Sequence, residues 1–134
     1  MTRKKFIKMY TAFIQCAIRL NEKAGKYGVS SLEDEVYDLV DSDLRTGLRF
    51  VAEETDPAII DEIFSNKISF EKDKYVRQLL IIKKRAVLGI QKQESTRILY
   101  YVLNSYANLT SKERNNIDDI IFNDVSDSDD IDTN

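Results

Sequence analysis

Residues 70–93 carry the clearest structural pattern in the chain, which is FEKDKYVRQLLIIKKRAVLGIQKQ. Apolar side chains recur there at intervals of three and four residues, the period of an α-helix that buries one face. One edge of that face contains Tyr75, Leu79, Ile82, Ala86 and Ile90, and the adjacent edge contains Val76, Leu80 and Val87. The pattern predicts a long helix whose apolar face is wide enough for the centre of a helical bundle.

Two further segments, one before and one after this helix, show the same period. Residues 3–24 place Phe6, Tyr10, Phe13, Ala17, Leu20 and Ala24 on one stripe, and residues 97–109 do the same with Ile98, Tyr101, Val102, Ser105, Tyr106 and Leu109. The chain of 134 residues contains one Pro and four Gly, too few for many short strands joined by turns. The sequence therefore predicts an all-α fold, a compact bundle of about six or seven helices.

Two capping signals predict where helices begin. Ser30-Ser31-Leu32-Glu33 and Thr110-Ser111-Lys112-Glu113 both match the capping box, in which a hydroxyl and an acid three residues later satisfy free amides at a helix start. We expect a short helix after each box. Gly25 and Gly28 precede the first box and are expected to end the helix before it. The buried face after the first box is expected to contain Leu32, Val36 and Leu39 or Val40.

Acidic residues are expected to cap two helices in the middle of the chain. Asp41-Ser42-Asp43 can cap a helix over residues 44–54. Asp56 can cap a helix over residues 57–64, which starts with Pro57 at the position where a missing N–H loses no hydrogen bond. Its apolar side is expected to contain Ile59, Ile60, Ile63 and Phe64. Gly47 lies inside the first of these helices, where Gly costs about 1 kcal/mol relative to Ala. We therefore expect another helix to approach closely at Gly47.

The charges are unevenly distributed along a chain whose net charge is −3. Residues 1–28 contain seven Lys or Arg and one Glu, whereas every charge from Asp118 to Asn134 is an Asp. We expect residues 1–123 to form a single helical domain and residues 124–134, which have few apolar side chains, to form a disordered acidic tail. Because the basic start is interleaved with a buried stripe, we expect no nucleic-acid binding.

The residue types present exclude most catalytic and metal sites. The sequence has no His, a single Cys, Cys16, and no Gly-rich phosphate motif, so a Cys/His zinc site has too few ligands. Cys16 lies in an apolar run and is expected to be a buried small hydrophobe, and the alternative is a reactive thiol. We therefore expect no catalytic residue, no cofactor, no metal and no enzymatic activity. The alternative is an enzyme or small-ligand-binding protein that uses the carboxylates Asp34, Glu35, Asp56 or Asp61.

The apolar stretches are too short for a membrane span. A span requires roughly eighteen uninterrupted apolar residues, and Lys83-Lys84-Arg85 breaks the most apolar stretch, Leu79 to Ile90. The basic start is not followed by the continuous apolar region of a signal peptide, so a cytoplasmic location is expected. Lys83-Lys84-Arg85 is expected to be the solvated face of a long helix, and the alternative is a binding patch for an acidic partner.

A set of residues between positions 28 and 63 has an order and spacing found in one known family. They are Gly28-Val29-Ser30-Ser31-Leu32-Glu33, Asp41, Leu44-Arg45, Gly47-Leu48, Val51, Thr55-Asp56-Pro57, Ile60 and Ile63. The pattern resembles the cytoplasmic segment of MotA-type flagellar stator proteins, in the MotA/TolQ/ExbB proton-channel family. The resemblance covers about residues 25–66, a third of the chain, and none of the family's transmembrane helices.

The resemblance implies a non-enzymatic protein-interaction module, an accessory or regulator of a flagellar motor. In the family, an Arg and a Glu of this segment act on charged residues of the rotor protein FliG. Glu33 matches that Glu, whereas the position of the Arg, eight residues earlier, is Gly25 here, with Lys23 and Lys26 beside it. The alternative role of Glu33 is the capping box alone. We expect a protein partner, a rotor or stator component, bound through Lys23, Lys26, Glu33, Asp34 and Glu35.

Overall fold

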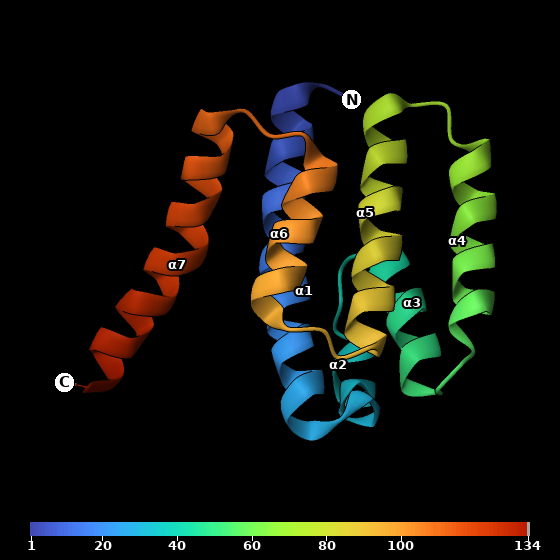
Figure 1. Ribbon diagram of the computed structural model, residues 1–134, viewed down its shortest axis with the longest axis horizontal. Coiled ribbons are helices and arrows are strands. Elements are labelled where there is room, and N and C mark those ends of the chain that lie inside the picture. The colour runs from blue at the N-terminus through green and yellow to red at the C-terminus, as the bar shows by residue number, and fades with distance from the viewer. Residues whose placement is uncertain (134) are drawn as a thin grey trace.

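The computed structural model describes the backbone of residues 1–133 and the side chains of residues 1–123. Over these residues the chain is helical and has no strand, so the all-α prediction is confirmed (Figure 1). The α-helices are α1 (Arg3–Tyr27), α2 (Glu33–Val36), α3 (Ser42–Ala52), α4 (Pro57–Phe70), α5 (Lys74–Gln91), α6 (Thr96–Ala107) and α7 (Ser111–Thr133). A 3-10 helix, η1 (Val29–Leu32), lies between α1 and α2.

Helix α5 is the centre of the bundle. It packs against α1, α3, α4 and α6, while α4 and α7 lie at opposite edges (Figure 1). The helix begins at Lys74 rather than near residue 70, because the carboxylate of Asp73 accepts hydrogen bonds from the first amides and caps it there. The predicted apolar face is buried at Leu79, Leu80, Ile82, Ala86, Val87 and Ile90.

The caps predicted at Asp41 and Asp56 are confirmed. Each carboxylate accepts a hydrogen bond from an amide of the first helical turn, at 2.9 Å in α3 and 2.8 Å in α4. Gly47 in the middle of α3 faces α5, where a Cβ atom would lie 2.7 Å from Cγ2 of Val87. The close approach of a second helix at Gly47 is therefore also confirmed.

Helix α4 is longer than the pattern predicts. It continues to Phe70 instead of ending at Phe64, and Ser65 and Asn66 do not interrupt it. Ile60 and Phe64 are buried against α5, and this packing outweighs the weaker helix preference of the two polar residues. The outer side of α4 carries Ile59 and Ile63, which the pattern places on the buried side but which are exposed.

Helix α6 buries a different face from the predicted one. Ile98, Tyr101 and Tyr106 are exposed, and the buried residues are Leu99, Tyr100, Leu103, Asn104 and Ala107. Both faces of α6 carry apolar residues, so the helical period alone does not predict which face is buried. The hydroxyl of Tyr10 in α1 donates to Oδ1 of Asn104 at 2.7 Å, and this partner allows the amide to be buried.

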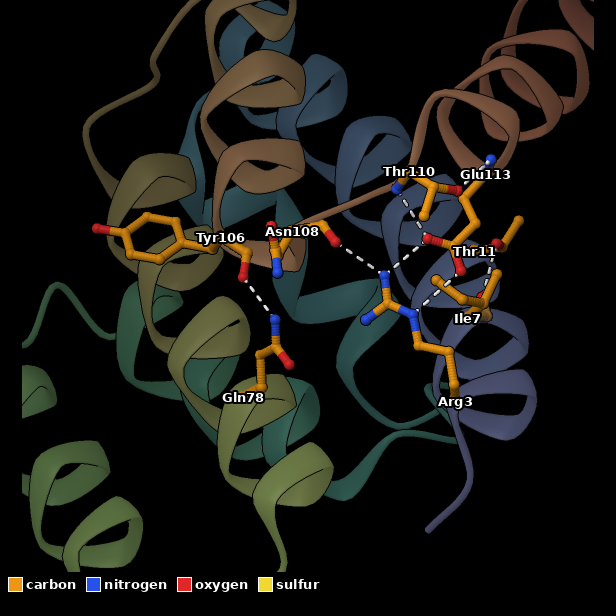
Figure 2. A network of polar contacts seen from close by, with 8 residues as sticks. All are labelled: Arg3, Ile7, Thr11, Gln78, Tyr106, Asn108, Thr110 and Glu113. Atoms are coloured by element: carbon orange, nitrogen blue, oxygen red, sulfur yellow. Dashed lines mark hydrogen bonds and ion pairs between the residues drawn. The ribbon is translucent and has the colours of Figure 1, made fainter.

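The capping box predicted at the start of α7 is confirmed. Thr110 Oγ1 accepts from the Glu113 amide at 3.1 Å, and the Glu113 carboxylate accepts from the Thr110 amide at 2.9 Å. The same carboxylate binds Arg3 of α1, so the cap also ties α7 to the bundle (Figure 2). The acidic tail expected over residues 124–134 lies outside the residues whose side chains the structure describes, and it stays a prediction.

The triplet Lys83-Lys84-Arg85 of α5 is not a solvated face. All three cations form ion pairs with acids from other segments, and Lys83 is only 8% exposed. Lys83 pairs with Asp41 at 2.8 Å and Asp43 at 3.3 Å, Lys84 with Asp61 at 3.0 Å, and Arg85 with Glu94 at 2.8 Å. The prediction is wrong because most of these acids are distant in the sequence, so local pattern does not reveal them.

Candidate functional site

The candidate contact surface is the segment of residues 23–35, here called the 23–35 turn, at the lower end of the bundle in Figure 1. Helix α1 runs past Gly25 and ends at Tyr27, and Gly28 then has a φ of 90°, which L side chains rarely adopt. The Gly28 amide donates to the Ala24 carbonyl at 2.8 Å. Gly28 alone ends the helix, and the prediction that Gly25 shares this role is wrong.

The capping box predicted at Ser30–Glu33 does not form. The chain enters η1 directly after Gly28, so Ser30 lies within a helical turn and lacks the extended backbone of a capping residue. Helix α2 follows Leu32, which gives no side-chain cap and is fully buried. The Ser31 hydroxyl donates to the Gly28 carbonyl at 2.6 Å instead. Burial of Leu32 therefore outweighs the local capping preference.

Glu35 joins α2 to α1. Its carboxylate accepts hydrogen bonds from Nη1 of Arg19 at 2.9 Å and from Nζ of Lys23 at 3.2 Å. The hydrogen bond from Arg19 is the largest cause that lowers the pKa of Glu35, and it also raises the pKa of Arg19. Partly exposed ion pairs of this kind contribute about 0–1 kcal/mol. They add to the burial of Leu32 and Val36, which holds α2 in the bundle.

Three of the five predicted contact residues are available to a partner. Lys26, Glu33 and Asp34 are exposed and form no ion pair with any residue whose side chain the structure describes. Nζ of Lys26 lies 5.3 Å from the centre of the exposed Tyr27 ring. The turn therefore combines the bridge from Lys23 to Glu35 with three uncommitted charges.

A hollow of about 380 Å³ opens beside the 23–35 turn, between α2 and α3. Glu33 and Asp34 line it together with Tyr37 and Arg49, and the guanidinium carbon of Arg49 lies 5.8 Å from the centre of the Tyr37 ring. Tyr37 is 78% exposed. Neither residue belongs to the apolar stripe of its segment, so the exposure of both side chains could be predicted from the sequence. That they share one hollow depends on how α2 packs on α3, which the helical pattern does not reveal.

The carboxylates of the alternative small-molecule site do not form one site. Asp56 caps α4, Asp61 pairs with Lys84, and Glu35 is held by α1, which leaves Asp34 alone without such a role. Among the residues with described side chains, no group of three or more His, Cys, Asp or Glu is placed to hold a metal ion. In the same part of the chain, no helix has both the length and the apolar character to cross a bilayer.

Comparisons with protein-family models, with curated proteins and with solved structures found no match for this chain. Function is therefore argued from the residues of the 23–35 turn and from the elements around it.

Proposed function

We propose that this protein is a non-enzymatic interaction module that binds a protein partner through the 23–35 turn, and that the partner is a component of a flagellar motor. The observation that carries the proposal is the division of charges in the turn. Glu35 is paired with α1, and burial of Leu32 holds the backbone beside it. Lys26, Glu33 and Asp34, by contrast, are exposed and form no ion pair with any residue whose side chain is described. Fixed charges at an exposed edge speed association and select a partner of complementary charge.

The choice of partner rests on Glu33. Most other residues of the stator resemblance have structural roles that the bundle explains: Asp41 and Asp56 cap helices, and Gly47 allows α3 to approach α5. Residues with such structural roles could be alike in any two proteins that share this helical arrangement, so they do not indicate a partner. Glu33 is exposed and caps nothing, so its match to the family's charged residue is the part of the resemblance that supports a motor partner.

Gly25 stands where the family has its Arg, and it allows a gain-of-function test. A Cβ atom at Gly25 would meet nothing within 4 Å, and the residue lies inside α1. Gly25→Arg should therefore fold, with a gain of about 0.5–1 kcal/mol in the free energy of unfolding, because Arg favours a helix more than Gly does. The substitution also adds the missing cation to the proposed contact surface.

Binding to the purified rotor protein FliG of the same organism, measured by biolayer interferometry, tests the proposal. Lys26→Glu and Glu33→Lys should weaken binding, mainly through slower association, and Gly25→Arg should strengthen it. Lys72→Glu is the matched control, with the same charge change on an exposed residue between α4 and α5, at the other end of the bundle. Absence of binding, or equal binding by the Lys26→Glu and Lys72→Glu variants, would refute the proposal.

A further inference from the structure

A groove runs along one face of α1, apart from the 23–35 turn. Two adjoining hollows, of about 620 and 530 Å³, share Met9 and Ala12. The larger hollow is mainly apolar, with Met9, Ala12 and Cys16 on the α1 side and Leu39, Val40 and Leu44 on the facing side. We call the two hollows together the α1 groove. Of the two residues that the helical pattern offers for burial, Leu39 is buried and Val40 is not.

Apolar side chains stand exposed on both rims of the α1 groove. Val40 is 97% exposed, and Met9 on the other rim is 40% exposed. The backbone around Val40 is held on both sides, since Arg45 donates to the preceding carbonyl at 3.0 Å and Lys83 binds the following residue, Asp41, at 2.8 Å. Val40 therefore projects from a held backbone and, together with Met9, adds exposed apolar surface to the rims of the groove.

Three lysines at the N-terminal end of α1 have no carboxylate partner among the residues whose side chains the structure describes. Lys4, Lys5 and Lys8 line the smaller hollow, are exposed, and form no ion pair within the part of the chain whose side chains are described. The first turn of α1 contains no acidic residue. Lys83, which lines the larger hollow, is by contrast neutralised by Asp41 and its neighbour Asp43. Uncompensated positive charge therefore lies at one end of an apolar groove.

The length and surroundings of the α1 groove fit a helix. The described part of the chain has no strand, and so it offers no sheet edge to which an extended peptide could add. From Lys4 to Arg19 the groove follows α1 over fifteen residue steps, or about 22 Å at 1.5 Å per residue. A helix of about four turns, packed with its axis about 8–10 Å from that of α1, covers this length.

We infer that the α1 groove binds an amphipathic helix of a partner protein, with its apolar stripe against Met9, Ala12 and Val40 and its acidic side chains over the three lysines. Burial of the exposed apolar rims supplies most of the affinity, because it removes that surface from water. The acidic side chains set the orientation and speed the encounter. This contact uses residues outside the 23–35 turn and gives the module a second protein-binding surface.

Fluorescence anisotropy with two synthetic peptides tests the inference on the full chain. Both peptides are helices of about sixteen residues with the same stripe of Leu, and their remaining positions are Glu in one and Lys in the other. The Glu peptide should bind, with an affinity that falls roughly tenfold when salt is raised to about 0.5 M, and the Lys peptide should not bind. Replacing Lys4, Lys5 and Lys8 together by Glu should reverse the preference.

A steric variant and a chemical readout locate the bound peptide. Ala12→Gln fills the middle of the groove without adding a charge and should weaken binding of the Glu peptide by roughly tenfold or more. Ala58→Gln is its matched control, since Ala58 is exposed on α4 and Gln is well accepted in helices. Cys16 is the only cysteine, and it is partly exposed in the groove rather than buried as predicted. Bound Glu peptide should therefore slow its alkylation by iodoacetamide.

Several results would overturn the inference. One is that neither peptide binds. Another is that the Ala12→Gln and Ala58→Gln variants bind the Glu peptide equally well. A third is that saturating Glu peptide leaves the alkylation of Cys16 unchanged. Binding to phosphatidylglycerol vesicles that Ala12→Gln weakens, without binding of the Glu peptide, would also overturn it by assigning the groove to a membrane surface. None of these results bears on binding of the rotor protein, because no altered residue belongs to the 23–35 turn.

Discussion

Arg3 and Glu113 lie 110 residues apart in the sequence and form a two-point ion pair that fastens α7 to α1 (Figure 2). Nη2 of Arg3 lies 2.7 Å from Oε1 of Glu113, and Nε lies 3.0 Å from Oε2. The same guanidinium donates to the Asn108 carbonyl at 2.8 Å. The hydrogen bond from Arg3 is the largest cause that lowers the pKa of Glu113, from 4.5 to about 2.

This ion pair should make stability depend on pH in acid. Because the pKa of Glu113 is lower in the folded than in the unfolded chain, its stabilising contribution is complete above about pH 4.5 and is lost as the pH falls towards 2. Urea unfolding between pH 6 and 2 should show a steeper loss for the wild type than for Glu113→Gln. Parallel curves for the two proteins would show that the ion pair contributes nothing to folding.

The two capping-box sequences should respond differently to the same substitution. Glu113→Ala removes a cap and the contact with Arg3, so the free energy of unfolding should fall by about 1–2 kcal/mol. Glu33→Ala removes no cap, and its effect should stay within about 0.5 kcal/mol. Chemical denaturation of both variants measures the difference. A comparable loss for Glu33→Ala would mean that the first box forms in solution.

Two glycines inside helices should give opposite effects when changed to Ala. Gly25→Ala should stabilise the protein by about 0.5–1 kcal/mol, because a Cβ atom there meets open space. Gly47→Ala should destabilise it by about 1–2 kcal/mol, because its Cβ atom would collide with the buried Val87. Val87→Ala in the same chain should restore part of the loss from Gly47→Ala. Melting temperatures test this set, and stabilisation by Gly47→Ala would argue against the close packing of α3 on α5.

Lys83→Met tests the ion-pair cluster between α5 and α3. The variant keeps the apolar stem but leaves Asp41 and Asp43 without their buried cation, so the free energy of unfolding should fall by about 2 kcal/mol. Adding Asp41→Asn and Asp43→Asn should recover much of this loss, since Asn can still cap α3. If Lys83→Met alone is as stable as the wild type by urea unfolding, the cluster is not a stabilising element.

The helical period was sufficient to predict the fold class and the central helix, but not which faces are buried. Residues 74–91 have one clearly wider apolar face, so α5 was predictable. Helix α6 has apolar residues all round, and the bond between Tyr10 and Asn104 chooses its buried face. Lys83 is buried because of acids about forty residues earlier in the chain. Such choices depend on tertiary contacts that local sequence does not contain.

The sequence was sufficient to predict which charged residues the candidate site contains, but not which of them pair with one another. Opposite charges between Lys23 and Glu35 are visible in the sequence. Which of them pair depends on η1, which replaces the expected capping box and brings Glu35 against Arg19. The same turn leaves Lys26 and Glu33 unpaired within the described residues. The hollow shared by Tyr37 and Arg49 likewise arises only when α2 packs on α3.

Photo-crosslinking in the cell tests most directly whether the 23–35 turn contacts a motor component. The photoreactive residue p-benzoylphenylalanine replaces Lys26 in one strain and Lys72, on the opposite end of the bundle, in a control strain. We expect an adduct from position 26, identified by mass spectrometry as a flagellar rotor or stator protein, and no such adduct from position 72. No adduct from position 26, or the same adducts from both positions, would contradict the assignment of this turn as the contact surface.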